Sequence, residues 1–350
     1  MGQSVIPTRR LFSVCIPAYN RAHFLRELLD SIFAQDFKDF EVVICEDCSP
    51  QRQQIAAIAH EYRSRCPERL RYFENEANLG YDANIRNLVG KASGQFCFFM
   101  GNDDLMCPGA LRNVAGLIHR FPKVGVVLKS YGIFYETPQK VTQEIRWFTE
   151  EKEFAAGTLS IRFAFRRSGV ISGYVIDRAS AHEAATERFD GTLYYQMHLT
   201  ANVLINKTAV CTPKMLVLCR ATESPDFGNC GKEKGKFSPG RYTPQARLHM
   251  IEGALTIIRD LKRTKGIDVV EDVVHDYANY FYPYIKDQLA LPLRDYWDLY
   301  RAYGRMGFAK YPLFHIYFIL GYILGESRFD SITALIRRRL GRSPRLGNVY

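Results

Sequence analysis

Two carboxylates stand side by side in the stretch FFMGNDDLMCPG, which runs from Phe98 to Gly109. An apolar run ends at Gly101, and Asp103 and Asp104 follow it almost directly. Because adjacent like charges repel, such a pair at the end of a buried strand needs a positive partner. The alternative is a type I turn with two solvated aspartates, although a turn of that kind needs no buried strand before it.

Two earlier apolar runs also end in polar groups, at Pro17-Ala18-Tyr19-Asn20-Arg21 and at Glu46-Asp47. Apolar spacing predicts strands at residues 11–19, 40–47, 70–75 and 94–100, and helices at residues 22–35, 51–65 and 81–92. This alternation is typical of an α/β fold whose sheet is mostly parallel and flanked by helices. In such sheets ligands bind beyond the carboxyl ends of the strands, so we expect the three polar clusters to meet there.

The rest of the chain is less regular. We expect a helix at residues 108–122, a segment at 188–204 that begins as a loop and becomes helical, strands at 124–134, 168–178 and 212–222, and a polar excursion at about 136–160. Residues 223–244 are rich in Gly, Pro and Lys, and we expect a mobile segment there. The pattern is helical from about residue 247. We therefore predict one domain over 1–245, with halves at about 10–135 and 136–245, and a helical C-terminal region over 246–350.

Near the C-terminus, 15 apolar residues at 311–325 are too few for a spanning helix, which needs about 20. The following segment carries apolar residues along one helical face and ends in a basic cluster of Arg337, Arg338, Arg339 and Arg342. This composition predicts a basic amphipathic helix at a membrane surface. The alternative is a bundle helix with a solvated basic face.

Composition narrows the class of protein. The 350 residues carry 47 Lys and Arg against 37 Asp and Glu, a net charge of +10 that attracts polyanions. The positive charge is concentrated in the 223–244 segment and the tail, and no nucleic-acid motif occurs, so we expect no nucleic-acid partner. Nine cysteines without framework spacing favour a reducing compartment. The spacing of Cys45 and Cys48 resembles a zinc or redox motif, but no second Cys or His pair occurs at zinc-ligand spacing, so we expect no zinc or redox site there.

Three segments in order, FSVCIPAYNR, FEVVICEDCSP and NEANLGYDANIRNLVGKASGQFCFFMGNDDLMCPGAL, give the chain a family resemblance. It resembles the nucleotide-sugar-dependent glycosyltransferases of family 2, with the GT-A fold, a Rossmann-like mixed sheet. The resemblance covers about residues 10–135 and fades by about 205. FMGNDDL with PGAL is similar to the bacterial branch that builds O-antigen and other surface polysaccharides, abequosyltransferase-like enzymes included.

The resemblance implies a donor site in the first half of the chain. It places the nucleoside pocket at Pro17, Ala18, Tyr19 and Arg21, and it makes Asp47 the acceptor of a hydrogen bond from the base. The alternatives are a simple strand-end turn for residues 17–21 and a helix N-cap for Asp47. Asn78, Gly80 and Asn84 match a segment that runs beside the donor in the family, and Gly80 would allow positive φ or close approach to phosphate.

The family's D-x-D motif falls on the opening stretch. Its carboxylates hold Mg²⁺ or Mn²⁺, hard cations that favour oxygen ligands and bridge the donor phosphates. Gly101 stands where the first aspartate of the family often stands. We therefore assign Asn102 and Asp103 to the donor, Asp103 and Asp104 to the metal–ribose cluster, and prefer Asp104 as the metal ligand.

The acceptor half is less clear. An inverting transferase needs a carboxylate that deprotonates the acceptor hydroxyl, and Asp190 is the nearest candidate, with Glu187 as a weaker option. The alternative is that Thr192 occupies the position that aligns with the base of the family. The lysines of residues 223–244 suit a lid over the diphosphate, or a solvated loop. The resemblance implies a saccharide or lipid-linked acceptor, cell-surface polysaccharide synthesis and a cytoplasmic enzyme on the inner face of the membrane. The alternative is a non-catalytic sugar-nucleotide binder of the same fold.

Overall fold

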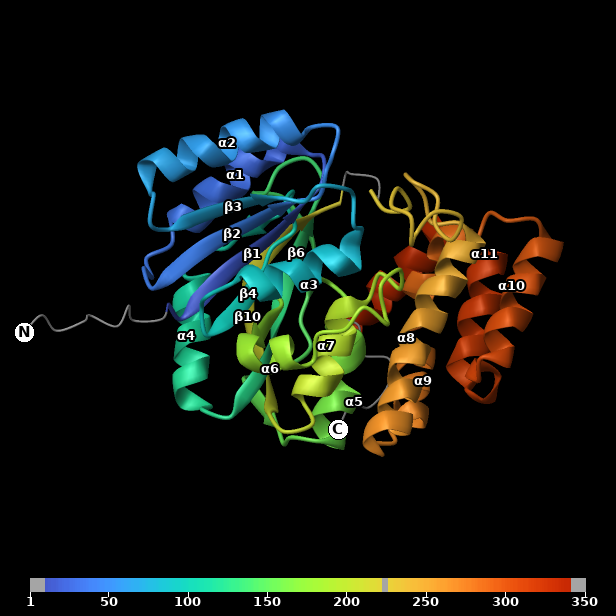
Figure 1. The fold of residues 1–350 in the computed structure, drawn as a ribbon. Coiled ribbons are helices and arrows are strands. Elements are labelled where there is room, and N and C mark those ends of the chain that lie inside the picture. Colours follow the sequence, from blue (N-terminus) through green and yellow to red (C-terminus); the bar gives the residue numbers. More distant parts are fainter. Residues whose placement is uncertain (1–9, 222–225, 341–350) are drawn as a thin grey trace, which may run out of the picture.

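The computed structural model describes residues 10–221 and 226–340, with side chains described as far as residue 332. Within these ranges the chain forms a ten-stranded sheet flanked by helices (Figure 1). The strands are β1 (Phe12–Ala18), β2 (Phe40–Glu46), β3 (Leu70–Glu74), β4 (Phe96–Phe99), β5 (Leu105–Met106), β6 (Val124–Phe134), β7 (Val141–Ile145), β8 (Lys152–Phe154), β9 (Val175–Asp177) and β10 (Thr208–Arg220).

Helices connect most of these strands. They are α1 (Ala22–Phe33), α2 (Arg52–Arg65), α3 (Tyr81–Lys91), α4 (Ala110–Arg120), α5 (Thr158–Arg167), α6 (Arg178–Glu183), α7 (Tyr195–Val203), α8 (Pro244–Lys265), α9 (Val270–Ala278), α10 (Leu293–Arg305) and α11 (Pro312–Leu340). Short 3₁₀ helices lie at Tyr282–Tyr284, Lys286–Gln288 and Phe308–Lys310.

The main path of the sheet runs in the order β3-β2-β1-β4-β9-β6-β10-β5, with β7 paired to β6 and β8 to β10. Strands β3, β2, β1 and β4 are parallel, as are β6 and β10. Strand β9 is antiparallel to both β4 and β6, and it joins the two parallel groups. The predicted mixed, mostly parallel α/β sheet is therefore confirmed, and β1, β2 and β4 end at the same edge.

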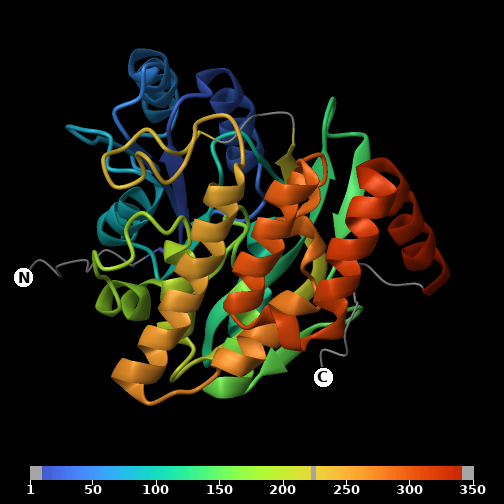
Figure 2. The same cartoon turned by 90° about the vertical axis from the view of Figure 1, so that its right-hand side faces the viewer.

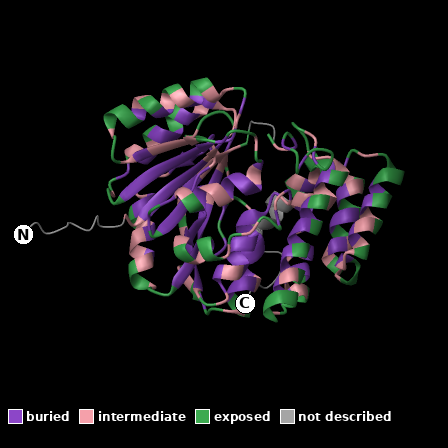
Figure 3. Cartoon of the chain, in the orientation of Figure 1, coloured by how far each residue is buried: buried purple, intermediate pink, exposed green. Residues whose placement is uncertain are grey.

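Alternate residues of the buried strands pack into two cores, one on each face of the sheet. Figure 3 shows that the central strands are buried. Val14 and Ile16 of β1 belong to the core that contains residues of α1, α2 and α4. Cys15 and Cys45 belong to the other core, together with α3, α5, α7 and the C-terminal helices. Because both faces are covered, β1 and β2 are buried along almost their whole length and are mostly apolar.

Two predicted segments differ from the structure. The strand expected at 168–178 is limited to Val175–Asp177, because Gly173 has a positive φ of 75° and interrupts the extended backbone. The polar excursion at 136–160 contains the edge strands β7 and β8. The segment at 188–204 begins as a loop and becomes helical, as predicted. Helix α7 begins at Tyr195, after Gly191 and Leu193, whose φ values are 84° and 61°.

Helices α8 to α11 gather on one side of the sheet, as both Figures 1 and 2 show. Helix α11 is broken at Gly325, where φ is 70° and ψ is 171°. In the described part of the chain we find no helix with the length and apolar composition to cross a membrane. The basic cluster at residues 337–339 and 342 lies outside the residues whose side chains are described.

Candidate functional site

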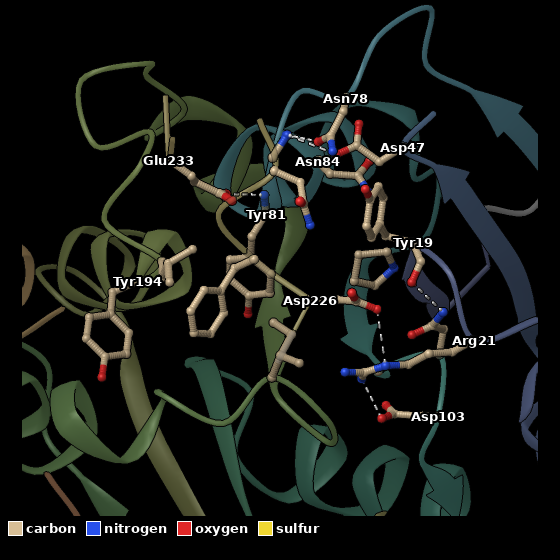
Figure 4. Close-up of a pocket in the computed structure, with 18 of the residues that line it drawn as sticks. Tyr19, Arg21, Asp47, Asn78, Tyr81, Asn84, Asp103, Tyr194, Asp226 and Glu233 are labelled. Atoms are coloured by element: carbon tan, nitrogen blue, oxygen red, sulfur yellow. Dashed lines mark hydrogen bonds and ion pairs between the residues drawn. The ribbon is translucent and has the colours of Figure 1, made fainter. Parts of the chain in front are cut away.

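A pocket of about 310 Å³ lies beyond the carboxyl ends of β1, β2 and β4 (Figure 4). It brings together most of the donor and metal residues expected from the sequence: Pro17, Tyr19, Arg21, Asp47, Asn78, Gly80, Asn84, Asn102, Asp103 and Asp104. Ala18 is fully buried in the core at the end of β1 and is not among the lining residues. The three polar clusters therefore meet at one edge of the sheet.

Asp47 organises the wall of the pocket that follows β2. Its Oδ1 accepts from Asn75 Nδ2 at 2.8 Å and from the Leu79 backbone N–H at 2.9 Å, and its Oδ2 accepts from the Gly80 N–H at 2.9 Å. Burial raises the pKa of the Asp47 carboxyl, whereas these donors oppose the shift. The carboxylate therefore fixes the 79–80 backbone while it also lines the pocket.

Asn84 ties the same wall to the sheet. Its Nδ2 donates to the Cys45 carbonyl at 3.1 Å, and its Oδ1 accepts from Asn75 Nδ2 at 3.2 Å. Asn75 thus bridges two of the predicted residues, although the sequence did not single it out. An Asn directly after a strand is the signal that would have included it.

Gly80 occupies a position that other residues would not fit. Its φ is 86°, and a Cβ atom there would lie 2.6 Å from Glu233 Oε1 and would clash with Cys230 Sγ. The close approach that the sequence suggested for Gly80 is therefore present, but it is made by the segment after residue 225. That segment packs directly over the start of α3.

The segment 226–243 supplies carboxylates to the pocket rather than the expected cations. Asp226 and Glu233 line it, together with Phe227, Asn229 and Tyr242. Glu233 is buried, and its two oxygens accept from the Tyr81 N–H at 3.0 Å and the Gly228 N–H at 2.8 Å. None of the lysines expected to form a lid over the diphosphate is a lining residue in the described part of this segment.

Asp103 has a protein cation beside it. Arg21 Nη1 donates to Asp103 Oδ2 at 2.6 Å, and Arg21 Nε lies 3.7 Å from Asp226 Oδ2. Figure 4 shows the guanidinium between the two carboxylates. The positive partner that the adjacent aspartates require is therefore, for Asp103, the guanidinium of Arg21.

Asp104 is held from behind the pocket. Its Oδ2 accepts from the Ser172 hydroxyl, and its Oδ1 accepts from the Arg220 backbone N–H at 2.7 Å. Burial, followed by the neighbouring Asp103 carboxylate, raises the pKa of Asp104. Ser172 and Arg220 come from segments that the sequence linked to no site, because their approach to Asp104 depends on the packing of β9 and β10.

These carboxylates fit a hard divalent cation only with help from a ligand. Among the described residues, no three His, Cys, Asp or Glu side chains come together as a metal cluster. A Mg²⁺ site, however, usually needs only one or two carboxylates with substrate phosphates. Asp103 and Asp104 both line the pocket, so both remain candidate ligands of such a cation.

Asp190, the expected base, does not line the pocket. Its carboxylate is paired with Arg86 Nη1 and lies 2.7 Å from Lys232 Nζ, and its side chain is only 2% exposed. A carboxylate between two cations and away from the pocket is placed to hold segments together. Asp190 therefore links segments through ion pairs in this structure, and its role as the base stays a prediction.

Asp82 is the residue whose importance the sequence did not reveal. Its Oδ2 accepts from the backbone N–H groups of Gly191, Thr192 and Leu193 at 2.8 to 2.9 Å, and its Oδ1 accepts from the Tyr195 N–H at 3.0 Å. These bonds hold the turn before α7, which carries Leu193 and Tyr194 into the pocket. An Asp in the first turn of a helix resembles an ordinary helix-end preference, so no local signal marked it.

The first half of the chain is similar in sequence to known glycosyltransferases. Residues 13–174 match the family model described as Glycosyl transferase family 2. The chain is 33% identical over 143 residues to the poly(ribitol-phosphate) beta-N-acetylglucosaminyltransferase TarS of Staphylococcus aureus, and 33% identical over 101 residues to the abequosyltransferase RfbV of Salmonella typhimurium. The matched stretches are 37% and 29% of this chain, but only 24% and 30% of those proteins.

Solved structures extend the likeness to nearly the whole fold. TarS residues 1–349 in complex with UDP-GlcNAc superpose with a TM-score of 0.59 at 19% identity, covering 95% of this chain and 93% of that one. A mannosyltransferase from Pyrobaculum calidifontis, in complex with GDP-Man and Mn²⁺, gives a TM-score of 0.53 at 15% identity, covering 91% and 88%. The fold of this chain is therefore the GT-A fold.

Proposed function

We propose that this chain is a family 2 glycosyltransferase that transfers a sugar from a nucleotide diphosphate sugar to a saccharide acceptor; its residues 13–174 match the model of that family. The observation that carries the proposal is the convergence of Tyr19, Asp47 and Asp103 on one pocket from three separate strand ends. The complexes of the structural neighbours with UDP-GlcNAc and GDP-Man support a nucleotide-sugar donor.

The nucleoside would bind between β1 and the loop after β3. Tyr19 offers a ring for stacking, and Asp47 keeps carboxylate lone pairs for a base N–H beside the three donors that it already accepts. Burial and the Asp226 carboxylate raise the pKa of the Tyr19 hydroxyl, so this group stays protonated and can donate a hydrogen bond. Asn78 and Asn84 complete this wall of the pocket.

The diphosphate would lie toward Arg21 and Asp103. A divalent cation, Mg²⁺ or Mn²⁺, would be held by Asp103 together with the phosphates, and it would supply charge neutralisation for the departing diphosphate. Asp104 would support Asp103 from behind through its bonds to Ser172 and the Arg220 backbone. The Mn²⁺ complex of the Pyrobaculum mannosyltransferase supports this choice of cofactor.

The acceptor would enter from the side of the pocket formed by Tyr194, Phe227 and Tyr242. We propose inversion at the anomeric carbon, with Asp226 in place of Asp190 as the base that accepts the proton of the acceptor hydroxyl. The Asp226 side chain is 35% exposed and lines the pocket, whereas both oxygens of Glu233 are bound to backbone N–H groups. Accessibility is what a general base needs.

A binding experiment tests the donor site. UDP-, GDP-, CDP- and dTDP-linked hexoses are added with Mn²⁺, and the melting temperature is recorded. A donor at 100 times its dissociation constant should stabilise the fold by about 2.7 kcal/mol. Asp47→Asn should abolish the shift, whereas Asp36→Asn, at a side chain that is 54% exposed, should retain it. No shift with any donor would reject the proposal.

The alternative function, a sugar-nucleotide binder without catalysis, is favoured by one observation: the expected base lies outside the pocket. Slow hydrolysis of the bound donor separates the two functions, because a transferase without its acceptor commonly passes the sugar to water. Release of the sugar that falls at least about 100-fold in Asp226→Asn, with donor binding unchanged, would support transfer with Asp226 as base. Binding without any release would support the alternative.

We further propose a lipid-linked acceptor of cell-surface polysaccharide synthesis and a cytoplasmic location on the inner face of the membrane. The poly(ribitol-phosphate) in the name of the matched TarS supports a polymeric acceptor, and the arginine-rich sequence at 337–339 supports contact with an anionic membrane surface. The full chain should sediment with vesicles that contain anionic lipid and remain unbound to zwitterionic ones. Replacement of Arg337, Arg338 and Arg339 by Gln should abolish this binding; equal sedimentation with both vesicles would contradict it.

A further inference from the structure

One guanidinium serves two carboxylates of the pocket. Arg21 Nη1 lies 2.6 Å from Asp103 Oδ2, and Arg21 Nε lies 3.7 Å from Asp226 Oδ2. The side chains of Arg21 and Asp103 are 17% and 11% exposed, so water screens this pair only weakly. The same guanidinium lines the pocket, where a diphosphate would bind (Figure 4).

The backbone that carries Arg21 is in a strained conformation. Asn20 and Arg21 have positive φ values of 54° and 58°, a conformation that costs residues other than glycine about 1–2 kcal/mol each. Asn102 Nδ2 donates to the Asn20 carbonyl at 2.8 Å and so links this strained turn to the end of β4. Strained positions of this kind persist where the surrounding structure enforces them, and they mark functional segments.

Asp103 is the carboxylate that we take as the ligand of the cation. Asp104 is held by the Ser172 hydroxyl and the Arg220 backbone, and both of these groups belong to the folded sheet region. Arg21, in contrast, reaches Asp103 through a long side chain that can rotate. A divalent cation that binds Asp103 Oδ2 would therefore have to displace the guanidinium, and two cations at one oxygen repel each other.

We propose that Arg21 is an exchangeable counter-charge that couples the binding of the divalent cation to the binding of the nucleotide diphosphate. When the diphosphate enters, the guanidinium passes from Asp103 to the phosphate oxygens, which it can bind through two N–H groups. Asp103 Oδ2 is then available to the cation. The inference rests on the proposed function, because it takes a nucleotide diphosphate as the ligand of the pocket.

This coupling has two consequences. Without nucleotide, the site binds the cation weakly, because Arg21 occupies Asp103. With nucleotide, each ligand raises the affinity for the other by the same factor, since coupling between two binding equilibria is reciprocal. A factor of about 10 or more lies within the range of such couplings.

The test measures Mn²⁺ binding directly, without turnover. Free Mn²⁺ is followed by electron paramagnetic resonance in titrations of the full chain alone, with UDP and with GDP, each corrected by the same titration without protein. Wild type should bind Mn²⁺ at least about 10-fold more tightly with the nucleotide that it recognises. Arg21→Gln should bind Mn²⁺ alone several-fold more tightly than wild type does, should bind the nucleotide more weakly and should lose most of the coupling.

Three variants serve as controls. Arg112→Gln removes a guanidinium that is 63% exposed and paired with Asp36, so its binding curves should match wild type. Arg21→Lys keeps the positive charge without the two-pronged geometry and should fall between wild type and Arg21→Gln. Asp103→Asn should weaken Mn²⁺ binding with and without nucleotide. Melting curves of each variant separate loss of binding from loss of folding.

The outcomes distinguish this inference from the proposed function. If neither UDP nor GDP binds, and no other nucleotide diphosphate does, the proposed function fails. If a nucleotide binds but wild-type Mn²⁺ affinity is the same without it, the coupling is refuted and the proposed function stands. An Arg21→Gln variant that folds and binds Mn²⁺ and nucleotide as wild type does would also overturn the inference.

Discussion

The buried Asp82 carboxylate offers the sharpest test of how this site is positioned. It is 1% exposed and accepts from four backbone N–H groups of residues 191–195. Asp82→Asn keeps the shape of the side chain but replaces one carboxylate oxygen by an N–H₂ group. If the amide oxygen takes the place of Oδ2, three backbone bonds survive, and the N–H₂ group then faces the Tyr195 N–H.

The cost follows from these contacts. Hydrogen bonds to a charged group contribute about 1.5–3 kcal/mol and neutral ones about 0.5–1.5, so the three surviving bonds lose roughly 3 kcal/mol together. The unpaired Tyr195 N–H costs about 1–3 kcal/mol more. Burying a neutral amide in place of a charge offsets part of this loss. We therefore expect the free energy of unfolding to fall by about 3 kcal/mol.

Urea unfolding followed by circular dichroism measures this change, with Asp36→Asn as the matched control. The Asp36 side chain is 54% exposed and paired with Arg112, so its replacement should change stability by less than about 0.5 kcal/mol. Because Asp82 holds the turn that carries Leu193 and Tyr194, transfer activity should also fall under conditions where the variant is folded. A destabilisation by Asp82→Asn below about 1 kcal/mol would refute the reasoning.

Three further predictions concern single positions. Gly80→Ala should weaken nucleotide binding at least about 10-fold by calorimetry, because the φ of Gly80 is 86° and an added Cβ would clash with Cys230. Gly90→Ala, in open space on α3, should bind nucleotide as wild type does. Equal affinities of Gly80→Ala and wild type would contradict the packing argument. Asp190→Asn should lower the melting temperature by several degrees while turnover falls less than about 10-fold, since the Asp190 carboxylate is an ion-pair partner and does not line the pocket. A loss of turnover of about 1,000-fold at unchanged stability would instead support Asp190 as the base. Burial lowers the pKa of Lys129 to about 8. Between that pH and the ordinary lysine pKa of about 10.4, the folded state binds fewer protons than the unfolded state, so the free energy of unfolding should rise with pH. This rise should be smaller in Lys129→Met, and identical slopes of stability against pH in urea unfolding would refute the role of burial.

Much of the donor half could be predicted from the sequence because its signals are local. Apolar runs that alternate with helical spacing indicate parallel strands, and the polar residues after each run then mark one edge of the sheet. Tyr19, Asp47 and Asp103 were found in this way, and all three line the pocket. The fold class followed from the same pattern and is confirmed.

The acceptor half could not be predicted to the same depth. Asp190 lies close in sequence to the turn at the pocket, yet its partners are Arg86 and Lys232, which are 104 and 42 residues away. Asp82 holds that turn from more than 100 residues away. A carboxylate that is a base and one that is an anchor have the same local sequence signature, because their roles depend on which donors reach them.

The sequence by itself therefore determined the sheet, its ligand edge and the pair of carboxylates that needed a positive partner. Only the tertiary structure decided that Arg21, 82 residues before Asp103, supplies that partner in this structure, and that Asp104 is held by Ser172 and the Arg220 backbone. The physical reason is that hydrophobic periodicity records which face of an element is buried. The choice of partner for a buried charge is made by the packing of distant segments, which periodicity does not record.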